Sequence, residues 1–386
     1  MGTSRLRARD LGLPLPGTPG AHNAITDVPG VEVGFTTIKS LATKPGERQI
    51  YTGVTAVLPR GHAHRPLPVW AGQHAFNGNG EMTGTHWIDD AGYFVGPVCL
   101  TNTHSVGMVH HAAVGWMIEQ YHEHFEHYAW AMPVVAETYD GLVNDVRGRH
   151  VQEHHALQAL NSAKGGPVLE GNVGGGAGNA TYDFKGGTGT SSRRVQVDNL
   201  QYTVGTLVQS NFGSRPEFKP FGVPVGQHIT ENAVLADRGV GELGSIIVLI
   251  ATDAPLTPTQ LRRVAKRGAI GIGRTGTSGG HYSGDLMLAF SVANELYLPA
   301  VGESQPHSFQ TEWLNDAYID YIFRATVESI EESILNAMIA AESVPMIKPA
   351  GDVLTAIDHA RLLEVLRQHG LPLNKPAAPL PKSARP

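Results

Sequence analysis

The chain has 386 residues, 41% of them apolar and 17% charged, enough for one large domain or two ordinary ones. Its formal net charge of −6 gives no general attraction to nucleic acid or to anionic membranes, so we expect neither as a partner. A single cysteine, Cys99, excludes an internal disulfide framework, a thiolate zinc site and an iron–sulfur cluster.

Neither a membrane span nor an export signal is expected. The longest unbroken apolar run, Ile246 to Ala251, is far shorter than the ~20 residues that cross a bilayer. The first residues, MGTSRLRARDLGLPLPG, include basic side chains but no apolar stretch, unlike a secretory signal. We therefore expect a cytoplasmic protein, with a proline-rich and disordered tail at 375–386.

Strand-like and helix-like stretches are interspersed along the whole chain. Apolar or alternating runs between turn residues predict strands at 31–38, 53–58, 133–137, 202–209, 246–251 and 286–292. Longer amphipathic stretches predict helices at 106–125, 145–162, 316–341 and 356–367. This pattern, without a fixed-period repeat, favours one mixed domain of helices and sheets over residues 1–386.

One helix has clear start and stop signals. Thr257 is a candidate N-cap, followed by Pro258 in the first turn and by Gln260 as the capping-box partner. Gly268 follows a basic last turn, as expected for a glycine just beyond a helix end. Two glycine-dense stretches, 165–189 and 268–280, indicate tight turns or close approach of backbone segments.

Polar clusters at the ends of apolar strands are candidate functional residues. The segment Ala136-Glu137-Thr138-Tyr139-Asp140 provides a carboxylate and a phenol that could orient a cationic amine, although a strand-end turn explains it equally well. Gly244 and Ser245 directly precede the most apolar strand, which alone indicates only a turn before a strand.

A histidine motif offers a different chemistry. His150, Glu153 and His154 have the H-x-x-E-H spacing of inverted zinc peptidases, which on a helix places both imidazoles on one face. The competing interpretation is a polar helix face in a chain with 19 histidines. His122, His124 and His127 likewise have the pattern of a solvated helix end, and we expect no metal at either cluster.

Taken together, several short motifs resemble one family. They are Asn23-Ala24-Ile25-Thr26-Asp27-Val28-Pro29-Gly30-Val31, Thr101-Asn102-Thr103, the 136–140 segment, Phe184-Lys185-Gly186-Gly187-Thr188-Gly189-Thr190-Ser191-Ser192-Arg193, Gln209-Ser210-Asn211-Phe212-Gly213, Gly244-Ser245-Ile246-Ile247 and Ser283-Gly284-Asp285. Their order and spacing resemble the aminopeptidases typified by the L-aminopeptidase D-amidase/D-esterase DmpA and the β-peptidyl aminopeptidases. The resemblance covers nearly the whole chain.

The resemblance implies a self-cleaving hydrolase of the N-terminal-nucleophile type. Its fold would be α+β, a four-layer αββα sandwich, and it would need no cofactor. Cleavage between Gly244 and Ser245 would give an α chain, 1–244, and a β chain, 245–386, which assemble into oligomers of αβ heterodimers. Ser245 would then supply both a nucleophilic hydroxyl and a free α-amine, whose ordinary pKa of about 7.7–8.0 suits a base at neutral pH.

The resemblance also assigns roles around that serine. Asn211 falls at the position of the oxyanion donor. Ser283 and Asp285, the latter a glutamate in some relatives, fall where the family orients the new amine. Glu137 matches the anchor for the substrate amine, and Tyr139 matches a phenol that lines the pocket. The substrate would be a small peptide or an amino-acid amide with a free amino terminus.

Three alternatives remain open on the sequence. An acyltransferase resembling the ornithine acetyltransferases would also cleave itself, but that family has threonine where this chain has Ser245. A zinc peptidase built on His150 and His154 would lose activity with a chelator. A non-catalytic binding protein is disfavoured, because each family position named above holds a chemically competent residue.

Overall fold

The computed structural model describes residues 6–42, 47–239, 241–242, 244–304 and 306–375. Of the tail predicted to be disordered, all but Lys375 lies outside the described residues. Among these residues no helix is both long and apolar enough to cross a membrane.

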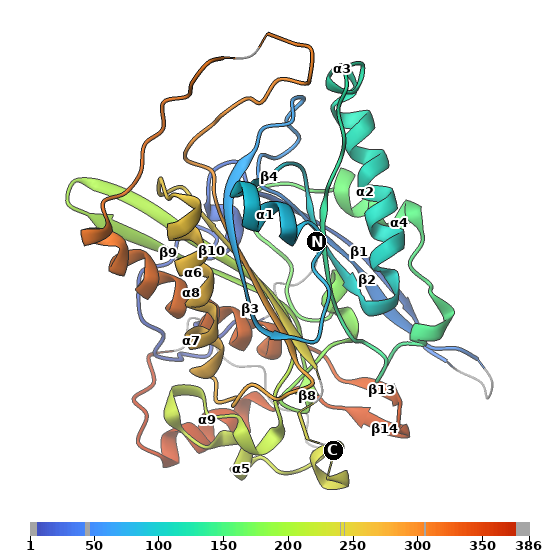
Figure 1. Ribbon diagram of the computed structural model, residues 1–386. Coiled ribbons are helices and arrows are strands. Elements are labelled where there is room, and N and C mark those ends of the chain that lie inside the picture. The colour runs from blue at the N-terminus through green and yellow to red at the C-terminus, as the bar shows by residue number, and fades with distance from the viewer. Residues whose placement is uncertain (1–5, 43–46, 240, 243, 305, 376–386) are drawn as a thin grey trace.

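Two sheets pack face to face between layers of helices (Figure 1). The four-stranded sheet has the order β1 (Glu32–Ser40), β2 (Ile50–Leu58), β5 (Val98–Asn102) and β6 (Val134–Thr138). The six-stranded sheet has the order β4 (Tyr93–Phe94), β3 (Val69–Gly78), β12 (Gly284–Ser291), β11 (Ser245–Thr252), β10 (Leu200–Asn211) and β9 (Gly187–Val197).

Helices cover the outer face of each sheet. α2 (Val106–Gln120) and α4 (Glu153–Asn161) pack on the four-stranded sheet. α6 (Pro258–Lys266), α7 (Gly268–Gly273) and α8 (Ile319–Ile339) lie on the six-stranded sheet (Figure 1). The expected four-layer αββα sandwich is thus confirmed.

Shorter elements connect these layers. The helices among them are α1 (Thr85–Ala91), α3 (His122–Phe125), α5 (Val225–His228) and α9 (His359–Gln368). The strands are β7 (Ala180–Thr181), β8 (Phe184–Lys185), β13 (Val344–Ile347) and β14 (Ala350–Leu354).

Strand β11 shows how one apolar strand contributes to two cores. Successive side chains of a strand point to opposite faces. Ile246, Val248 and Ile250 therefore pack with the helices, whereas Ile247 and Leu249 pack between the two sheets. A third core joins the four-stranded sheet to α2 and α4. Because β11 is covered on both faces, its sequence is a continuous apolar run from Ile246 to Ala251 rather than an alternating pattern. The same alternation places Ser245 on the face of Ile247, toward the other sheet.

All six predicted strands are present, as β1, β2, β6, β10, β11 and β12. The expected helix 106–125 is interrupted at Tyr121, giving α2 and α3. The expected helix 145–162 is wrong over its first half, because α4 begins only at Glu153. The last two predicted helices correspond to α8 and α9.

Strand β9 was not predicted, because its residues 187–193 are polar and glycine-rich although they are buried. Ser191 and Thr190 are buried and donate hydrogen bonds to the carbonyl groups of Ser329 in α8 (2.6 Å) and Thr206 in β10 (2.6 Å). A Cβ on Gly189 would clash with the backbone of α8. Close approach of backbone thus explains the glycine density here.

The capping box at the start of α6 is confirmed. Gln260 N–H donates to Thr257 Oγ1 (3.3 Å), and Thr257 N–H donates to Gln260 Oε1 (2.9 Å). Gly268 lies just beyond the end of α6, as expected, but its φ is not left-handed and it is also the first residue of α7. A Cβ there would lie 2.5 Å from Met287 Cγ, so this glycine is needed for close packing on β12.

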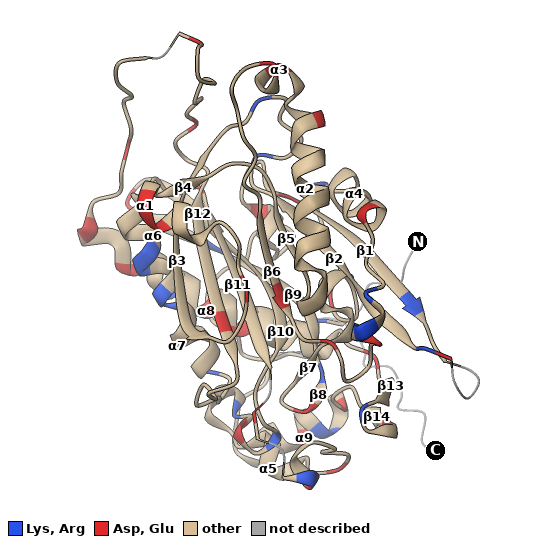
Figure 2. Cartoon of the chain, turned by 45° about the vertical axis from the view of Figure 1, so that its right-hand side comes forward, with Lys and Arg blue, Asp and Glu red and all other residues tan. Residues whose placement is uncertain are grey.

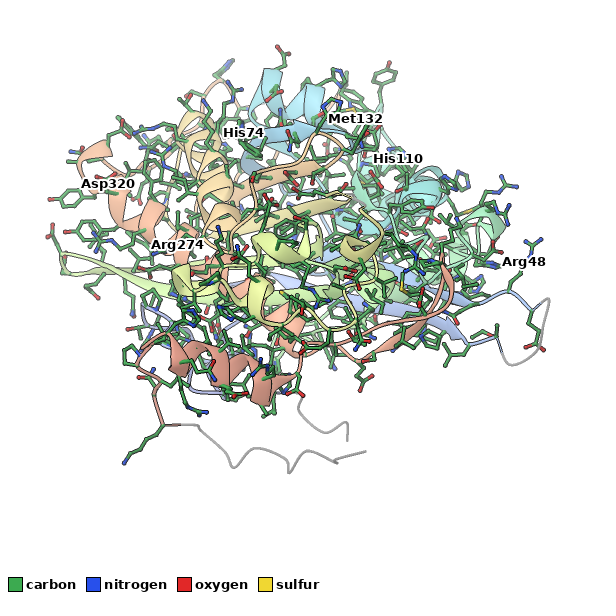
Figure 3. All side chains as sticks on the ribbon, turned by 90° about the horizontal axis from the view of Figure 1, so that it is seen from below. Arg48, His74, His110, Met132, Arg274 and Asp320 are labelled. Carbon is green, nitrogen blue, oxygen red and sulfur yellow. The ribbon has the colours of Figure 1, made fainter. Side chains whose placement is uncertain are left out.

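Charged residues lie mainly along helices and loops, while the strands between the layers hold few of them (Figure 2). Side chains fill the space between sheets and helices (Figure 3). The buried carboxylates Glu137 and Asp285, at the ends of such strands, are therefore exceptions that need a chemical explanation.

Candidate active site

Ser245 is the first residue of β11 and lies between two partner strands. It is paired with Asn211 at the end of β10 and with Gly284 at the start of β12. The Gly284 N–H points at both Ser245 Oγ (3.1 Å) and the carbonyl oxygen of Gly244 (3.2 Å). The serine hydroxyl and the carbonyl group of the peptide before it thus share one backbone donor.

Gly244 is required at its position by close packing. A Cβ would clash with the carbonyl oxygen of Asn211 and would lie 3.2 Å from Phe212 Cα. Close contact with the end of β10 therefore explains why a glycine occupies this position.

Asn211 is buried beside Ser245 with its side chain fixed. Its Oδ1 accepts a hydrogen bond from the Ala180 N–H of β7 (2.8 Å). This contact orients the amide group so that Nδ2 remains as a donor. A fixed donor of this kind is what stabilisation of a developing oxyanion requires.

Ser283 and Asp285 form a second buried polar pair next to Ser245. Ser283 Oγ donates to Asp285 Oδ1 at 2.6 Å, and Asn77 Nδ2 donates to Asp285 Oδ2 at 3.1 Å. Burial raises the pKa of Asp285, and the nearby charge of Glu242 raises it further, while the Ser283 and Asn77 hydrogen bonds oppose this. The pair is suited to hold a cationic amine formed at residue 245.

Glu137 ends an inner strand and is also buried, with 4% of its surface exposed. Its Oε1 accepts from the Glu81 N–H (3.0 Å), and its Oε2 accepts a short hydrogen bond from Thr103 Oγ1. Burial raises the pKa of Glu137, and these two hydrogen bonds oppose the effect. A carboxylate that is fixed and partly desolvated in this way is a suitable partner for an ammonium group.

Gly80 connects Glu137 with the surroundings of Ser245. A Cβ on Gly80 would lie 3.3 Å from Glu137 Oε1 and 3.5 Å from the Cα of Gly284. The Glu137 carboxylate therefore lies on one side of Gly80, and Gly284, whose N–H donates to the Ser245 hydroxyl, lies on the other. The structure thus brings together four separate segments of the sequence, which carry Glu137, Asn211, Ser245 and the pair Ser283 and Asp285.

Tyr139 is placed differently from the other candidates. It is 39% exposed, and its hydroxyl accepts a hydrogen bond from Lys348 Nζ (3.3 Å). These contacts direct the phenol toward the turn between β13 and β14.

The histidine motif does not have the geometry of a zinc site. His150 precedes α4, so His150 and His154 are not on successive turns of one helix. His150 Nε2 lies 3.2 Å from Asp145 Oδ2, whereas the rings of His154 and His155 contact each other at 3.9 Å between centroids. Among the described residues, no group of three or more His, Cys, Asp or Glu side chains could hold a metal ion.

We expect activity to be unaffected by EDTA, because the candidate nucleophile, oxyanion donor and amine-binding groups are all side chains of the chain itself. The measurement is the rate on an aminoacyl para-nitroanilide before and after prolonged dialysis against chelator. A loss of rate that added zinc restores would contradict this expectation.

Sequence reasoning missed several supporting residues. Asn77, which binds Asp285, lies in the Asn- and Gly-rich segment 77–80 and gave no signal beyond a turn. The Glu81 N–H could not be identified, because a backbone donor has no sequence signature. Thr103 lies in one of the family motifs but had no assigned role.

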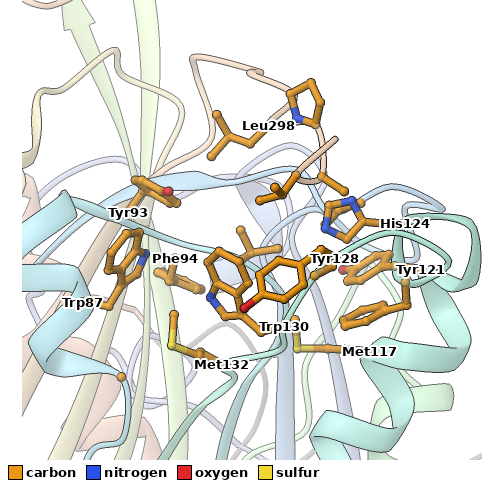
Figure 4. A pocket seen from close by; sticks show the side chains of 18 of the residues that line it. Trp87, Tyr93, Phe94, Met117, Tyr121, His124, Tyr128, Trp130, Met132 and Leu298 are labelled. Carbon is orange, nitrogen blue, oxygen red and sulfur yellow. The ribbon is translucent and has the colours of Figure 1, made fainter. Parts of the chain in front are cut away.

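An apolar pocket of about 170 Å³ lies at the opposite end of β6 from Glu137, beside Val134 (Figure 4). Aromatic and methionine side chains line it, among them Trp87, Phe94, Met117, Tyr128, Trp130 and Met132. His124, expected to be solvated, is half-buried here, and burial lowers its pKa. Ser245 does not line this pocket, so it is separate from the candidate site.

Comparisons with known proteins identify the family of the chain. The model of peptidase family S58 matches residues 23–350. The chain is 47% identical to β-peptidyl aminopeptidase BapA of Sphingosinicella microcystinivorans, over 94% of this chain and 92% of that protein.

Two solved structures are similar to the present one. The first, with a TM-score of 0.89, is the L-aminopeptidase D-Ala-esterase/amidase of Ochrobactrum anthropi, which is described as a prototype of the serine aminopeptidases with a variant of the Ntn hydrolase fold. It is 51% identical, over 94% of this chain and 99% of that one. A β-aminopeptidase of Burkholderia sp. matches with a TM-score of 0.86 and 43% identity, over 95% and 99%.

Fold and relatives define the protein as a hydrolase of the aminopeptidase class with the N-terminal-nucleophile hydrolase fold. The chain belongs to peptidase family S58. These similarities support the aminopeptidase interpretation and neither the acyltransferase nor the zinc-peptidase alternative.

Proposed function

We propose that this aminopeptidase activates itself by cleavage between Gly244 and Ser245 and then works through an acyl-Ser245 intermediate. The observation that carries the proposal is the Gly284 N–H, which points at both the Ser245 hydroxyl and the Gly244 carbonyl oxygen. This arrangement holds a nucleophile next to a polarised carbonyl group in the uncleaved chain.

In the self-cleavage step, Ser245 Oγ attacks the carbonyl carbon of Gly244. The bond from that carbon to the Ser245 nitrogen breaks, and the hydroxyl proton passes to the nitrogen, which leaves as an amine. Water then hydrolyses the ester on Oγ, giving a carboxylate at Gly244 and a free α-amine and hydroxyl at Ser245. The products are the α chain, 1–244, and the β chain, 245–386, of one catalytic domain.

In turnover, the α-amine of Ser245 takes the Oγ proton as the hydroxyl attacks the substrate carbonyl group, and delivers this proton to the leaving amine. Asn211 Nδ2 binds the oxyanion, while Ser283 and Asp285 orient the α-amine. Glu137 binds the ammonium group of the substrate, with Tyr139 at the edge of the site. Water releases the acyl group, so the protein's own residues supply the chemistry without a cofactor.

The substrates proposed are small peptides, amides or esters with a free amino terminus. The relatives are named for β-peptidyl, L-amino-acid and D-alanyl substrates, and we extend this substrate class to the present protein. Rates on para-nitroanilides and amides of L-α-, D-α- and β-amino acids test the proposal. Absence of turnover on all three series would contradict it.

Glu137→Gln is expected to lower kcat/KM on amine-bearing substrates by roughly one to two orders of magnitude. A hydrogen bond to a charged group is worth roughly 1.5–3 kcal/mol, which corresponds to this factor. Self-cleavage involves no substrate amine and should continue. The measurement compares an aminoacyl anilide with its N-acetylated counterpart, for wild type and variant.

The pH dependence gives a second readout for Glu137. Because burial raises its pKa above the ordinary 4.5, the carboxylate becomes protonated earlier as the pH falls, and KM should rise in that range for the wild type only. A destabilised variant with unchanged preference for the free amine would instead make Glu137 a structural residue. Equal wild-type rates on the free and acetylated substrates would remove it from the site.

We further propose that αβ heterodimers assemble into a homo-oligomer in the cytoplasm. Exposed apolar side chains around the apolar pocket support this, since Tyr128 is 75% and Trp130 57% exposed, and such patches mark interaction surfaces. Trp130→Asp should reduce the mass measured by light scattering to that of one heterodimer, 41.2 kDa. A wild-type mass of 41.2 kDa at micromolar concentration would contradict the oligomer.

A further inference from the structure

Glu242 lies two residues before Gly244, and its carboxylate is held by three donors. Oε1 accepts from the Gly213 N–H (2.9 Å), and Oε2 accepts from the Gly280 N–H (2.7 Å). Thr277 Oγ1 lies 3.1 Å from both oxygens. No role assigned above uses this side chain.

The three donors come from the two segments that carry the catalytic groups. Gly213 follows Asn211 by two residues, at the end of β10. Gly280 and Thr277 belong to the loop that leads to Ser283. Glu242 therefore bridges the oxyanion side and the amine-orienting side of the site across the uncleaved chain.

Gly280 also contacts the candidate catalytic residues, through its carbonyl group. Its carbonyl oxygen accepts from the Ser283 N–H (2.9 Å) and from Asn77 Nδ2 (3.2 Å). The same Asn77 amide donates to Asp285. The N–H and the carbonyl group of Gly280 belong to adjacent peptide groups that meet at its Cα. The contact with Glu242 therefore restrains Gly280, whose carbonyl oxygen in turn binds the Ser283 N–H and the Asn77 amide.

We propose that Glu242 is a positioning residue for self-cleavage, which clamps the segment before the Gly244–Ser245 peptide against both sides of the site. This inference rests on the proposed function, since it concerns the same bond. The clamp acts on the uncleaved chain, because cleavage makes Glu242 part of a new chain end that no longer continues into Ser245. Its task is to hold the scissile carbonyl group under Ser245 Oγ.

A matched control is available in Glu217, which is half-buried like Glu242. Its Oε2 accepts from Ser214 Oγ (3.0 Å), and its Oε1 accepts a short hydrogen bond from Ser278 Oγ. Glu217 thus bridges the same two segments as Glu242, but it is not part of the segment before the scissile peptide. A general effect on loop stability would appear in both variants, whereas an effect on positioning would appear only in Glu242→Gln.

The test is the lifetime of the uncleaved chain. Wild type, Glu242→Gln and Glu217→Gln are produced as full chains by cell-free translation, quenched at intervals and separated on a denaturing gel. In Glu242→Gln an amide NH₂ group replaces one of the two carboxylate oxygens. It then faces the backbone N–H of either Gly213 or Gly280, so that one of these hydrogen bonds is lost. Cleavage should slow roughly 10- to 100-fold, as expected when a reacting pair is misplaced by about 1 Å. Glu217→Gln should cleave at the wild-type rate.

Two further measurements separate positioning from folding. The melting temperature of Ser245→Ala should fall by a similar amount when either Glu242→Gln or Glu217→Gln is added, because each change removes a hydrogen-bond acceptor from a half-buried carboxylate. Relative to wild type, Glu242→Gln should lose much less of its turnover rate per cleaved chain than of its self-cleavage rate. The two fold-decreases should differ by a factor of at least ten. Cleavage of Glu242→Gln at the wild-type rate, equal slowing by Glu217→Gln, or an equal loss of cleavage and turnover would each overturn the clamp. A wild-type chain that never cleaves would overturn the proposed function itself.

Discussion

Ser245→Ala should remain a single chain of about 41 kDa and should hydrolyse no substrate. Without the hydroxyl, nothing attacks the Gly244 carbonyl group, and the nucleophile of turnover is lost as well. Wild type should separate on a denaturing gel into chains of about 26 kDa and about 15 kDa, from scaling 41.2 kDa by residue number.

Ser291→Ala is the matched control for this change. Ser291 is also a buried serine, at the other end of the neighbouring strand β12, where it donates to the Ala254 carbonyl group (2.6 Å). Ser291→Ala should cleave and turn over despite some loss of stability. An uncleaved Ser291→Ala chain would show that cleavage follows general stability rather than the hydroxyl of Ser245.

Asn211→Ala is expected to lower kcat, measured per cleaved chain, by roughly 10²- to 10³-fold. Removal of one oxyanion donor has this effect in other serine hydrolases. KM should change little, because the donor acts mainly on charge that develops in the transition state. The measurement is steady-state kinetics on an aminoacyl para-nitroanilide.

Asn211→Asp separates the catalytic from the structural contribution of this residue. Aspartate can still accept from the Ala180 N–H, but it offers no donor and adds a negative charge next to the oxyanion. It should lose at least as much kcat as Asn211→Ala while retaining more of the melting temperature. Full activity in either variant would show that Asn211 is not the oxyanion donor.

The sequence predicts β11 well, because burial on both faces leaves a long apolar run, but it misses β5, which is short although fully buried. It also fails for β9, where the buried side chains of residues 188 and 190–192 are those of serine and threonine. Their hydrogen bonds to α8 are long-range contacts that no local pattern contains. The helix expected at 145–162 fails for a related reason: His150 contacts Asp145, and the chain before Glu153 follows these contacts rather than a helical period.

The candidate site was accessible to sequence reasoning only through motifs that lie at strand ends. Ser245, Asn211 and Asp285 meet because β10, β11 and β12 are neighbours in register, which the isolated motifs do not specify. Groups that reach the site across the sheet, such as Asn77 from β3, depend on that register entirely. The contact between Glu81 N–H and Glu137 likewise requires the three-dimensional structure.

The most direct test of the central claim is the intact mass of the purified protein under denaturing conditions, before and after reaction with a serine-directed acylating reagent. We expect two masses, for residues 1–244 and 245–386, with one acyl group added to the smaller chain only and no addition to Ser245→Ala. A single unmodified mass for the whole chain in an active preparation, or an acyl group on the larger chain, would contradict it.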